Sequence, residues 1–375
     1  MKARLTPARL RRHALAASLF APTTLARAVA RLGFVQADPI RSPARAQDLV
    51  LRHRVVGYRA GDLERGFGRL RLEEGFLYAY GFMPRGTARL LHPRTDPVSP
   101  DGRHLPSGLA ADVLAFVRAH GATHPQDLEA RFGRERAMNN WGGFSKATTR
   151  ILHSLQHHGL LRVVRRRDGI RVYEAAEPHP APLAPSDRVR ALVLLLARIL
   201  APVPATSLRA AFGLMARRTP GLGRVGHALE DLLKSGELAC GDLDDERYIW
   251  PADSNAAAAH DAPREVRFLA PFDPVVWDRR RFEHLWGWPY RLEAYTPPPK
   301  RRFGYYAMPL LWGDRVIGWV NAGTPNGRLE VEAGFVAARP AGRDFRRAFD
   351  AEVARLEVFL GSPLPLRERS PRSGG

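Results

Sequence analysis

The chain of 375 residues carries 58 Lys and Arg against 38 Asp and Glu, a formal net charge of +20 with a pI near 11.1. Hydrophobic residues make up 45% of it, which is enough for a buried core, and the length is typical of two to three domains. So large a positive excess indicates a polyanionic partner. Nearly all of it is arginine, whose planar fork binds phosphate oxygens in pairs.

Several functional classes are excluded or disfavoured by what the sequence lacks. The single cysteine, Cys240, excludes a disulfide framework and a cysteine-based zinc site. The apolar run at 191–197 is too short to cross a membrane. The spacings of a Walker loop, a nucleophile elbow and a zinc protease do not occur. We therefore expect no cofactor, no metal and no membrane partner, a cytoplasmic location and a monomer.

The chain begins with three expected helices. Thr6-Pro7 is typical of a helix start, and the cationic residues of that helix are expected to face outward: Arg9, Arg11, Arg12 and His13. A second helix is predicted from Thr23 or Thr24 to Gly33, and a third from Ser42-Pro43 onward. The apolar segment 34–40 lies between them.

In this segment Gln36 and Asp38 stand two residues apart. Along an extended backbone, residues i and i+2 point to the same side, so an amide and a carboxylate can share one pocket. The alternative is structural, because Asp before Pro initiates turns and Asp is a common helix cap. A pattern of two residues is weak on its own.

From 69 to 92, aromatic residues alternate with others at even positions: Phe76, Tyr78, Tyr80 and Phe82. A period of two predicts a strand with one aromatic face. Core packing is the more common role of such a stripe. The functional alternative is that Tyr78 and Tyr80 stack on an extruded base. The proline-rich segment 96–107 predicts a linker or loop.

The next two blocks repeat one order of elements, three helices followed by a two-stranded hairpin. In the first block, helices are expected at 107–119, at 125–132 and from Ser145 to His158, with a hairpin turn at Asp168-Gly169. In the second, they are expected at 187–199, 207–214 and 225–233, with strands at 236–240 and 247–250. This order predicts tandem winged helices, a variant of helix-turn-helix.

The two hairpins differ in charge. The first contains a group of arginines suited to phosphates: Arg165, Arg166, Arg167 and Arg171. The second is acidic: Asp242, Asp244, Asp245 and Glu246. We therefore predict that the first hairpin binds DNA, with Lys146 and Arg150 on the preceding helix as further contacts, and that the second module is a scaffold.

After a linker at 253–263, strand-like runs occur at 266–269, 290–295, 303–312, 316–321 and 328–336. They predict a small antiparallel sheet or barrel, closed by a helix at 344–360. The fold class is thus mainly α with β. The predicted domains are 1–100, 101–182, 183–252 and 264–362, followed by a disordered tail at 363–375.

Several motifs together resemble those of the winged-helix DNA glycosylases that repair interstrand crosslinks, the YcaQ/AlkZ-like family. Gln36-Ala37-Asp38 stands where the family has Gln-x-Asp, and Arg45-Ala-Gln-Asp48 and the segment 141–173 also fit. The most specific matches lie in the C-terminal part: Leu269-Ala-Pro-Phe-Asp273, Trp277-Asp-Arg-Arg280 and Tyr295-Thr-Pro-Pro-Pro-Lys-Arg-Arg-Phe-Gly-Tyr-Tyr306. One departure is Tyr80-Gly81-Phe82-Met83, where many members have Trp-Gly-His-Glu.

The resemblance implies hydrolysis of the N-glycosidic bond of an N7-alkylguanine in double-stranded DNA, including crosslinked purines. It implies that Asp38 is the catalytic carboxylate and that Gln36 positions water, and it adds Arg45, Lys300 and Arg301 as DNA contacts. The alternative is a winged-helix DNA-binding protein or regulator without catalysis. The surroundings of Gln36 and Asp38 distinguish the two, since a carboxylate engaged in capping bonds favours the binder.

Overall fold

The computed structural model describes residues 5–92, 94, 108–133, 136–138, 144–167, 169–177, 183–219, 221–254, 264–361 and 367–368. These residues form two compact units. Unit 1 comprises the segments Met1–Leu63, Val193–Ala210 and Leu229–Gly375, and unit 2 the segments Glu64–Leu192 and Ala211–Ala228. The domain boundaries predicted above concern a finer division and stay predictions. The expected linkers at 96–107 and 253–263 lie almost wholly outside the described residues.

The N-terminal part of unit 1 is helical. Its elements are α1 (Pro7–Ser18), α2 (Leu25–Leu32), β1 (Val35–Gln36), α3 (Ala46–Leu51) and α4 (Asp62–Arg65), the last of which ends in unit 2. Thr6 caps α1 as expected, with its hydroxyl oxygen accepting from Arg9 N at 3.2 Å. Gly33 ends α2 with φ of 68°, and a Cβ there would meet Leu195 at 2.7 Å, so glycine is required twice over.

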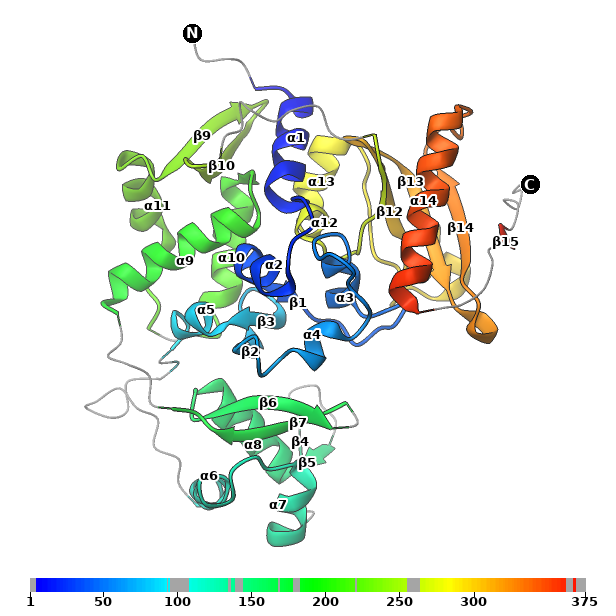
Figure 1. Ribbon diagram of the computed structural model, residues 1–375. Coiled ribbons are helices and arrows are strands. Elements are labelled where there is room, and N and C mark those ends of the chain that lie inside the picture. Colours follow the sequence, from blue (N-terminus) through cyan, green and yellow to red (C-terminus); the bar gives the residue numbers. More distant parts are fainter. Residues whose placement is uncertain are drawn as a thin grey trace. The chain divides into compact units, whose positions relative to one another are not determined.

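Two predictions for this part are wrong. The third helix begins at Ala46, because the backbone is not helical from Ser42 to Arg45. The cationic residues of α1 do not all face outward, since Arg11 and His13 are only 6% and 2% exposed. Arg11 donates to Leu285 O at 2.9 Å, and His13 bonds Ser254 Oγ at 3.1 Å. Packing of α1 against α12 (Pro274–Trp277) and α13 (Arg279–Trp286) covers Arg11 (Figure 1), whereas Trp250 and Ser254 cover His13.

The C-terminal part of unit 1 is a sheet with the order β11-β12-β13-β14-β15. Its elements are β11 (Val266–Phe268), β12 (Met308–Trp312), β13 (Arg315–Gly323), β14 (Glu330–Phe335) and β15 (Arg367–Glu368), with the 3-10 turns η2 (Pro298–Lys300) and η3 (Pro325–Gly327). Neighbouring strands are antiparallel except β14 and β15, which are parallel. Helix α14 (Arg343–Leu360) lies beside the sheet (Figure 1).

The sheet alternative therefore holds for the described strands, which do not close into a barrel. The segment 290–295 is not a strand, and β12 begins only at Met308, because the loop before it is held by side-chain hydrogen bonds instead of a ladder. Apart from β15, the tail at 363–375 lies outside the described residues.

The second repeated block has the expected elements: α9 (Pro185–Ile199), β8 (Val203–Pro204), α10 (Ala205–Ala216), α11 (Val225–Lys234), β9 (Leu238–Leu243) and β10 (Glu246–Pro251). β10 pairs antiparallel with both β8 and β9. Tyr248 and Trp250 of β10 pack with Leu10 of α1 and Leu285 of α13, so this sheet shares a hydrophobic core with the N-terminal helix.

Unit 2 contains the first repeated block: α6 (Leu109–His120), α7 (Pro125–Phe132), β4 (Arg136–Met138), β5 (Phe144–Lys146), α8 (Ala147–His157), β6 (Leu161–Arg167) and β7 (Ile170–Ala175). A core that includes Val113, Leu128, Leu155 and Tyr173 joins its helices to the hairpin. The third helix starts at Ala147, because Ser145 lies in β5 and does not cap it.

Unit 2 also contains β2 (Leu72–Phe76), β3 (Tyr80–Pro84) and α5 (Arg85–Arg89). The single aromatic strand predicted here is wrong, because the chain turns after Phe76 and returns as β3. The alternation of aromatic residues therefore runs through a turn and does not define one face. Tyr78 and Phe82 are buried, at 4% and 1% exposed, whereas Tyr80 is half-buried.

Candidate functional site

Asp38 lies two residues after β1, in a segment of irregular backbone. Its Oδ1 accepts a hydrogen bond from the backbone N–H of Ile40 at 2.9 Å, a short turn that does not begin a helix. Burial raises the pKa of the Asp38 carboxyl, and the Ile40 N–H lowers it by a smaller amount. The carboxylate is thus half-buried and lightly hydrogen-bonded.

Two further buried polar atoms of unit 1 bear on this site. Among the described residues, Gln36 Oε1 and the Tyr306 hydroxyl have no hydrogen-bond partner, although both atoms are buried. The pKa of Tyr306 is raised by burial and, next in size, by the negative charge of Asp38, so the phenol and the carboxylate interact electrostatically. Buried polar groups normally have partners, and exceptions are common where a water or a substrate binds.

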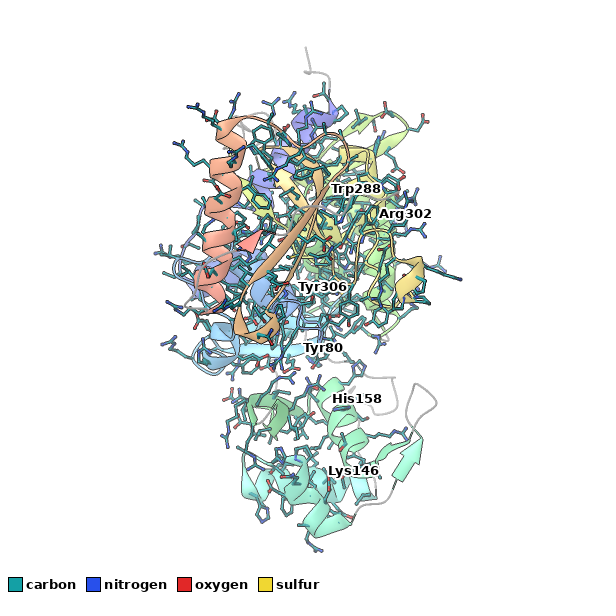
Figure 2. All side chains as sticks on the ribbon, turned by 90° about the vertical axis from the view of Figure 1, so that its right-hand side faces the viewer. Tyr80, Lys146, His158, Trp288, Arg302 and Tyr306 are labelled. Carbon is teal, nitrogen blue, oxygen red and sulfur yellow. The ribbon has the colours of Figure 1, made fainter. Side chains whose placement is uncertain are left out.

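The C-terminal motifs place Tyr306 in this cluster; Figure 2 labels it. Tyr290 donates its hydroxyl to Ala307 O at 2.6 Å, which anchors the residue after Tyr306. The guanidinium of Arg279 lies 4.5 Å from the centre of the Tyr290 ring and donates to Val276 O and Pro271 O at 2.6 and 2.7 Å. The motif around Arg279 therefore holds Tyr290, which in turn anchors the backbone next to Tyr306.

The other motif residues are structural. Asp273 forms an ion pair with Arg54, both of them with fully buried side chains, through oxygens 2.8 and 2.9 Å from the guanidinium nitrogens. Asp48 is buried and accepts from the Tyr58 hydroxyl at 2.8 Å and from Gly61 N at 2.9 Å. Arg45 is the residue before α3 and is half-buried. Asp48 and Asp273 therefore hold the frame in which Asp38 lies.

In unit 2, the four hairpin arginines fall into two pairs. Arg165 and Arg167 are exposed. Arg166 and Arg171 are half-buried and both bind Oε1 of Glu74, the second at 2.8 Å. Glu74 also accepts from the Tyr80 hydroxyl at 2.5 Å, and Arg171 lies over the Tyr80 ring at 4.7 Å. Glu74 thus offsets one of the two positive charges of Arg166 and Arg171 within the unit, and Arg165 and Arg167 face solvent.

A cavity of about 840 Å³ in unit 2 lies beside this cluster. Its lining includes many cationic groups: Arg85, Arg89, Arg94, Arg150, Arg162 and Arg171. Burial raises the pKa of Glu73, also in the lining, to about 7, while Arg85 at 3.3 Å opposes this. Met83 reaches the cavity wall and Phe82 is 1% exposed, so the apolar pair that replaces His-Glu has a buried environment here.

The remaining predicted DNA contacts are spread over both units. Lys146 (Figure 2) pairs with Glu129 at 2.5 Å, and Arg150 is exposed on α8. Lys300 is exposed and Arg301 half-buried in the loop before β12 of unit 1. Of the two base-stacking candidates, Tyr78 presents no accessible ring, since it is 4% exposed.

Sequence reasoning missed two residues of these clusters, Tyr306 and Glu74. Tyr306 ends a motif that was recognised by its resemblance, but nothing local shows that it reaches a segment 268 positions earlier in the chain. Glu74 lies next to Glu73 in a predicted strand. Because successive side chains of a strand point to opposite faces, the sequence predicts only that one of the two glutamates points inward. The structure buries Glu74 and leaves Glu73 half-buried.

Among the described residues, no group of three His, Cys, Asp or Glu side chains is arranged to hold a metal ion. None of the described helices is both long and apolar enough to cross a membrane.

Comparisons with known proteins identify a family and a similar solved structure. A model of the family "DNA glycosylase AlkZ-like" matches residues 29–359. The structure of Streptomyces sahachiroi DNA glycosylase AlkZ is similar with a TM-score of 0.63 at 14% sequence identity, over 98% of this chain and 100% of that one. At this identity the structural likeness speaks for the fold, and the family match covers the segments that carry Gln36, Asp38 and Tyr306.

Proposed function

The chain belongs to the AlkZ-like DNA glycosylase family and is a DNA glycosylase, and we propose that it excises N7-alkylated guanine from double-stranded DNA, including guanine held in interstrand crosslinks. The observation that carries the proposal is the environment of Asp38, a half-buried carboxylate that accepts one hydrogen bond among the described residues, from Ile40 N, and whose pKa is raised by burial. Perturbed, incompletely satisfied carboxylates are typical of sites that act on a substrate.

The chemistry of the lesion suits this site. Alkylation at N7 makes guanine cationic, so the base leaves as a neutral molecule and needs no strong acid to protonate it. As the bond between C1′ and N9 breaks, its electron pair moves to the base and positive charge develops on the sugar. The Asp38 carboxylate stabilises that charge, the task a carboxylate has in glycoside hydrolysis.

Water completes the reaction. Gln36 Oε1 and an Asp38 oxygen each accept a hydrogen from one water, whose lone pair then faces C1′. As the new bond from oxygen to C1′ forms, the second acceptor, Asp38, takes the proton. The Tyr306 hydroxyl, also without a partner among the described residues, contributes a donor to this arrangement. The products are free N7-alkylguanine and an abasic site.

The DNA contacts follow the charges. We propose winged-helix modules in both repeated blocks, with phosphates bound by the exposed Arg165 and Arg167 and, once they leave Glu74, by Arg166 and Arg171. Lys146, Arg150 and Arg45 are further proposed contacts, as are Lys300 and Arg301. Tyr80 is retained as a base-stacking residue, beneath Arg171.

The test is direct. Purified protein is incubated with duplex DNA that contains one N7-methylguanine, and abasic sites are revealed by alkaline cleavage of the strand. A crosslinked duplex is treated in parallel, and its unhooking is read from strand separation on a denaturing gel. Release from the duplex by the wild type, with release by Asp38→Asn slower by about 10² to 10³, supports the proposal. Binding without release by the wild type favours the non-catalytic alternative.

A further inference from the structure

The loop before β12, residues 290–307 of unit 1, is held by side-chain hydrogen bonds. Its carboxylate, Glu293, is 8% exposed and accepts three backbone N–H groups, those of Arg302 at 3.0 Å, Phe303 at 2.8 Å and Gly304 at 3.2 Å. Asn321 donates to Phe303 O at 2.6 Å and fills the space where a Cβ of Gly304 would stand. A loop held by a buried carboxylate has little freedom to rearrange when it binds a ligand.

This loop exposes two tyrosine rings to solvent, Tyr295 at 83% and Tyr305 at 43%. Tyr295 is the more exposed of the two, although side-chain hydrogen bonds hold the loop that carries it. Cationic side chains lie along the same loop: Arg291, Lys300, Arg301 and Arg302 (Figure 2 labels the last). Arg301 donates to Thr296 O at 2.8 Å and lies over the Tyr305 ring at 5.1 Å, so its side chain is held in place. An exposed ring with fixed cations beside it is suited to a nucleotide, whose base stacks while its phosphate is bound.

Contacts join the exposed ring of Tyr295 to the segment that carries Tyr306. Arg301 donates to the carbonyl of Thr296, the residue after Tyr295, and lies over the ring of Tyr305, the residue before Tyr306. Burial is the largest influence that raises the pKa of Tyr306, and the negative charge of Asp38 is the next, so the carboxylate lies within electrostatic reach of this phenol. Tyr295 and Asp38 therefore both lie near Tyr306.

We infer that the ring of Tyr295 stacks on the damaged base while Asp38 acts on its sugar. The inference rests on the proposed function and assigns to it a specificity residue. The π face of a tyrosine ring carries partial negative charge, so it attracts a cationic N7-alkylguanine more strongly than neutral guanine. Tyr295 thereby holds the lesion and selects for its charge.

The experiment measures binding, so that it does not depend on excision. Two duplexes are compared, one with guanine and one with the 2′-fluoro analogue of N7-methylguanine, which keeps the cationic base on a bond that resists hydrolysis. The ratio of their Kd values is determined for the wild type, Tyr295→Ala and Tyr295→Phe. Val56→Ala is the matched control, since Val56 is also exposed, at 72%, and lies in the same unit.

We expect the wild type to prefer the cationic duplex and Tyr295→Ala to lose about 10-fold of that preference, as when one base–aromatic stack is removed. Tyr295→Phe and Val56→Ala retain it. The inference is overturned if Tyr295→Ala keeps the preference, if Tyr295→Phe loses as much as Tyr295→Ala, or if the wild type shows no preference. A wild type that prefers the cationic duplex through Tyr295 yet releases no base from the hydrolysable one refutes the proposed reaction and leaves the stacking intact.

Discussion

Asp273 and Asp38, two carboxylates of unit 1, differ in how many hydrogen bonds the protein donates to them. Asp273 is 0% exposed and receives three donors, two from Arg54 at 2.8 and 2.9 Å and one from Val275 N at 3.0 Å. Asp38 is half-buried and receives a backbone donor from Ile40. Both belong to segments that resemble the family, yet only Asp38 combines partial desolvation with capacity to accept more bonds.

The same contrast separates two phenols of this unit. The Tyr290 hydroxyl donates to Ala307 O, whereas the Tyr306 hydroxyl has no partner among the described residues. A buried group that makes all its hydrogen bonds within the protein stabilises the fold. A buried group with an unused donor or acceptor is available to a substrate or to water. Whether the protein itself supplies a buried group's hydrogen bonds therefore distinguishes structural residues from candidate reactive ones better than residue type does.

Removing the charge of Asp273 from its buried ion pair with Arg54 should have the largest effect, on the free energy of unfolding. Asp273→Asn leaves the fully buried Arg54 guanidinium without a counter-charge, so the free energy of unfolding should fall by about 3–5 kcal/mol. Denaturant unfolding measures it. Asp253→Asn is the control, because Asp253 pairs with Arg198 at 3.3 Å but is 73% exposed, and a surface pair contributes about 0–1 kcal/mol. Equal losses in the two variants would break the distinction.

Asp38→Asn should affect chemistry and leave stability intact. Excision should fall by about 10² to 10³, the scale for losing one preorganised electrostatic group. DNA affinity should change little. Asparagine keeps an oxygen for the Ile40 N–H and removes a desolvated charge, so the melting temperature should hold or rise. Gln36→Ala should lose less activity, because water can replace a positioning amide.

Single-turnover excision, thermal melting and a binding titration on the same variants measure these outcomes. A lower melting temperature with weaker DNA binding would show instead that Asp38 has a structural role. Unimpaired excision by Asp38→Asn would remove the residue from the mechanism.

The raised pKa of Asp38 gives the pH dependence a definite sign. The folded protein binds this proton more tightly than the unfolded chain does, so ionised Asp38 lowers stability, and that cost disappears as pH falls through the raised pKa. Excision needs the ionised form and should decline over the same interval, which lies above the ordinary pKa of an aspartate. Activity and stability should therefore change in opposite directions on acidification, while Asp38→Asn shows no such change in stability.

Much of the fold was predictable, because its signals are local. The cap at Thr6, the end of a helix at Gly33 and the repeated order of helices and strands were all predicted from spacing and turn chemistry. The aromatic strand at 76–82 failed because a period of two cannot reveal a turn of three residues within it. The outward placement of His13 failed because the partners that bury it, Trp250 and Ser254, are more than 200 positions away in the chain.

The candidate site could be predicted only in part, for the same reason. Gln36 and Asp38 were proposed from a short segment and its resemblance to the family, and their catalytic role stays a prediction. Their electrostatic neighbour Tyr306 comes from the other end of the chain, and periodicity contains no information on such pairing. The ion pair between Arg166 and Glu74, which lie 92 positions apart in the chain, could not be predicted for the same reason.

Tyr306→Phe tests the role of the buried Tyr306 hydroxyl. If its hydroxyl donates to the water or to Asp38 in the transition state, excision should fall by about 10-fold, the lower end for a bond to a charged group. The melting temperature should hold or rise, since the change removes a buried hydroxyl that has no partner among the described residues. Tyr290→Phe is the control and should lower stability by about 1 kcal/mol, because it removes a made bond. The reverse pattern would exchange the roles of the two phenols.

The smallest effect is expected for the hairpin arginines. Here, too, side chains that are exposed to solvent differ from side chains that already have a partner within the protein. Arg165 and Arg167 are exposed, whereas Arg166 and Arg171 bind Glu74. Each phosphate contact adds about 0.9 to the slope of log K against log salt, so Arg165→Ala with Arg167→Ala should reduce the slope by about 2. Arg166→Ala with Arg171→Ala should reduce it less, because DNA must first displace Glu74. Titrations on one duplex at several salt concentrations measure both slopes. Equal reductions would mean that the ion pairs open fully on binding, and an unchanged slope in the quadruple variant would place the DNA-binding surface elsewhere.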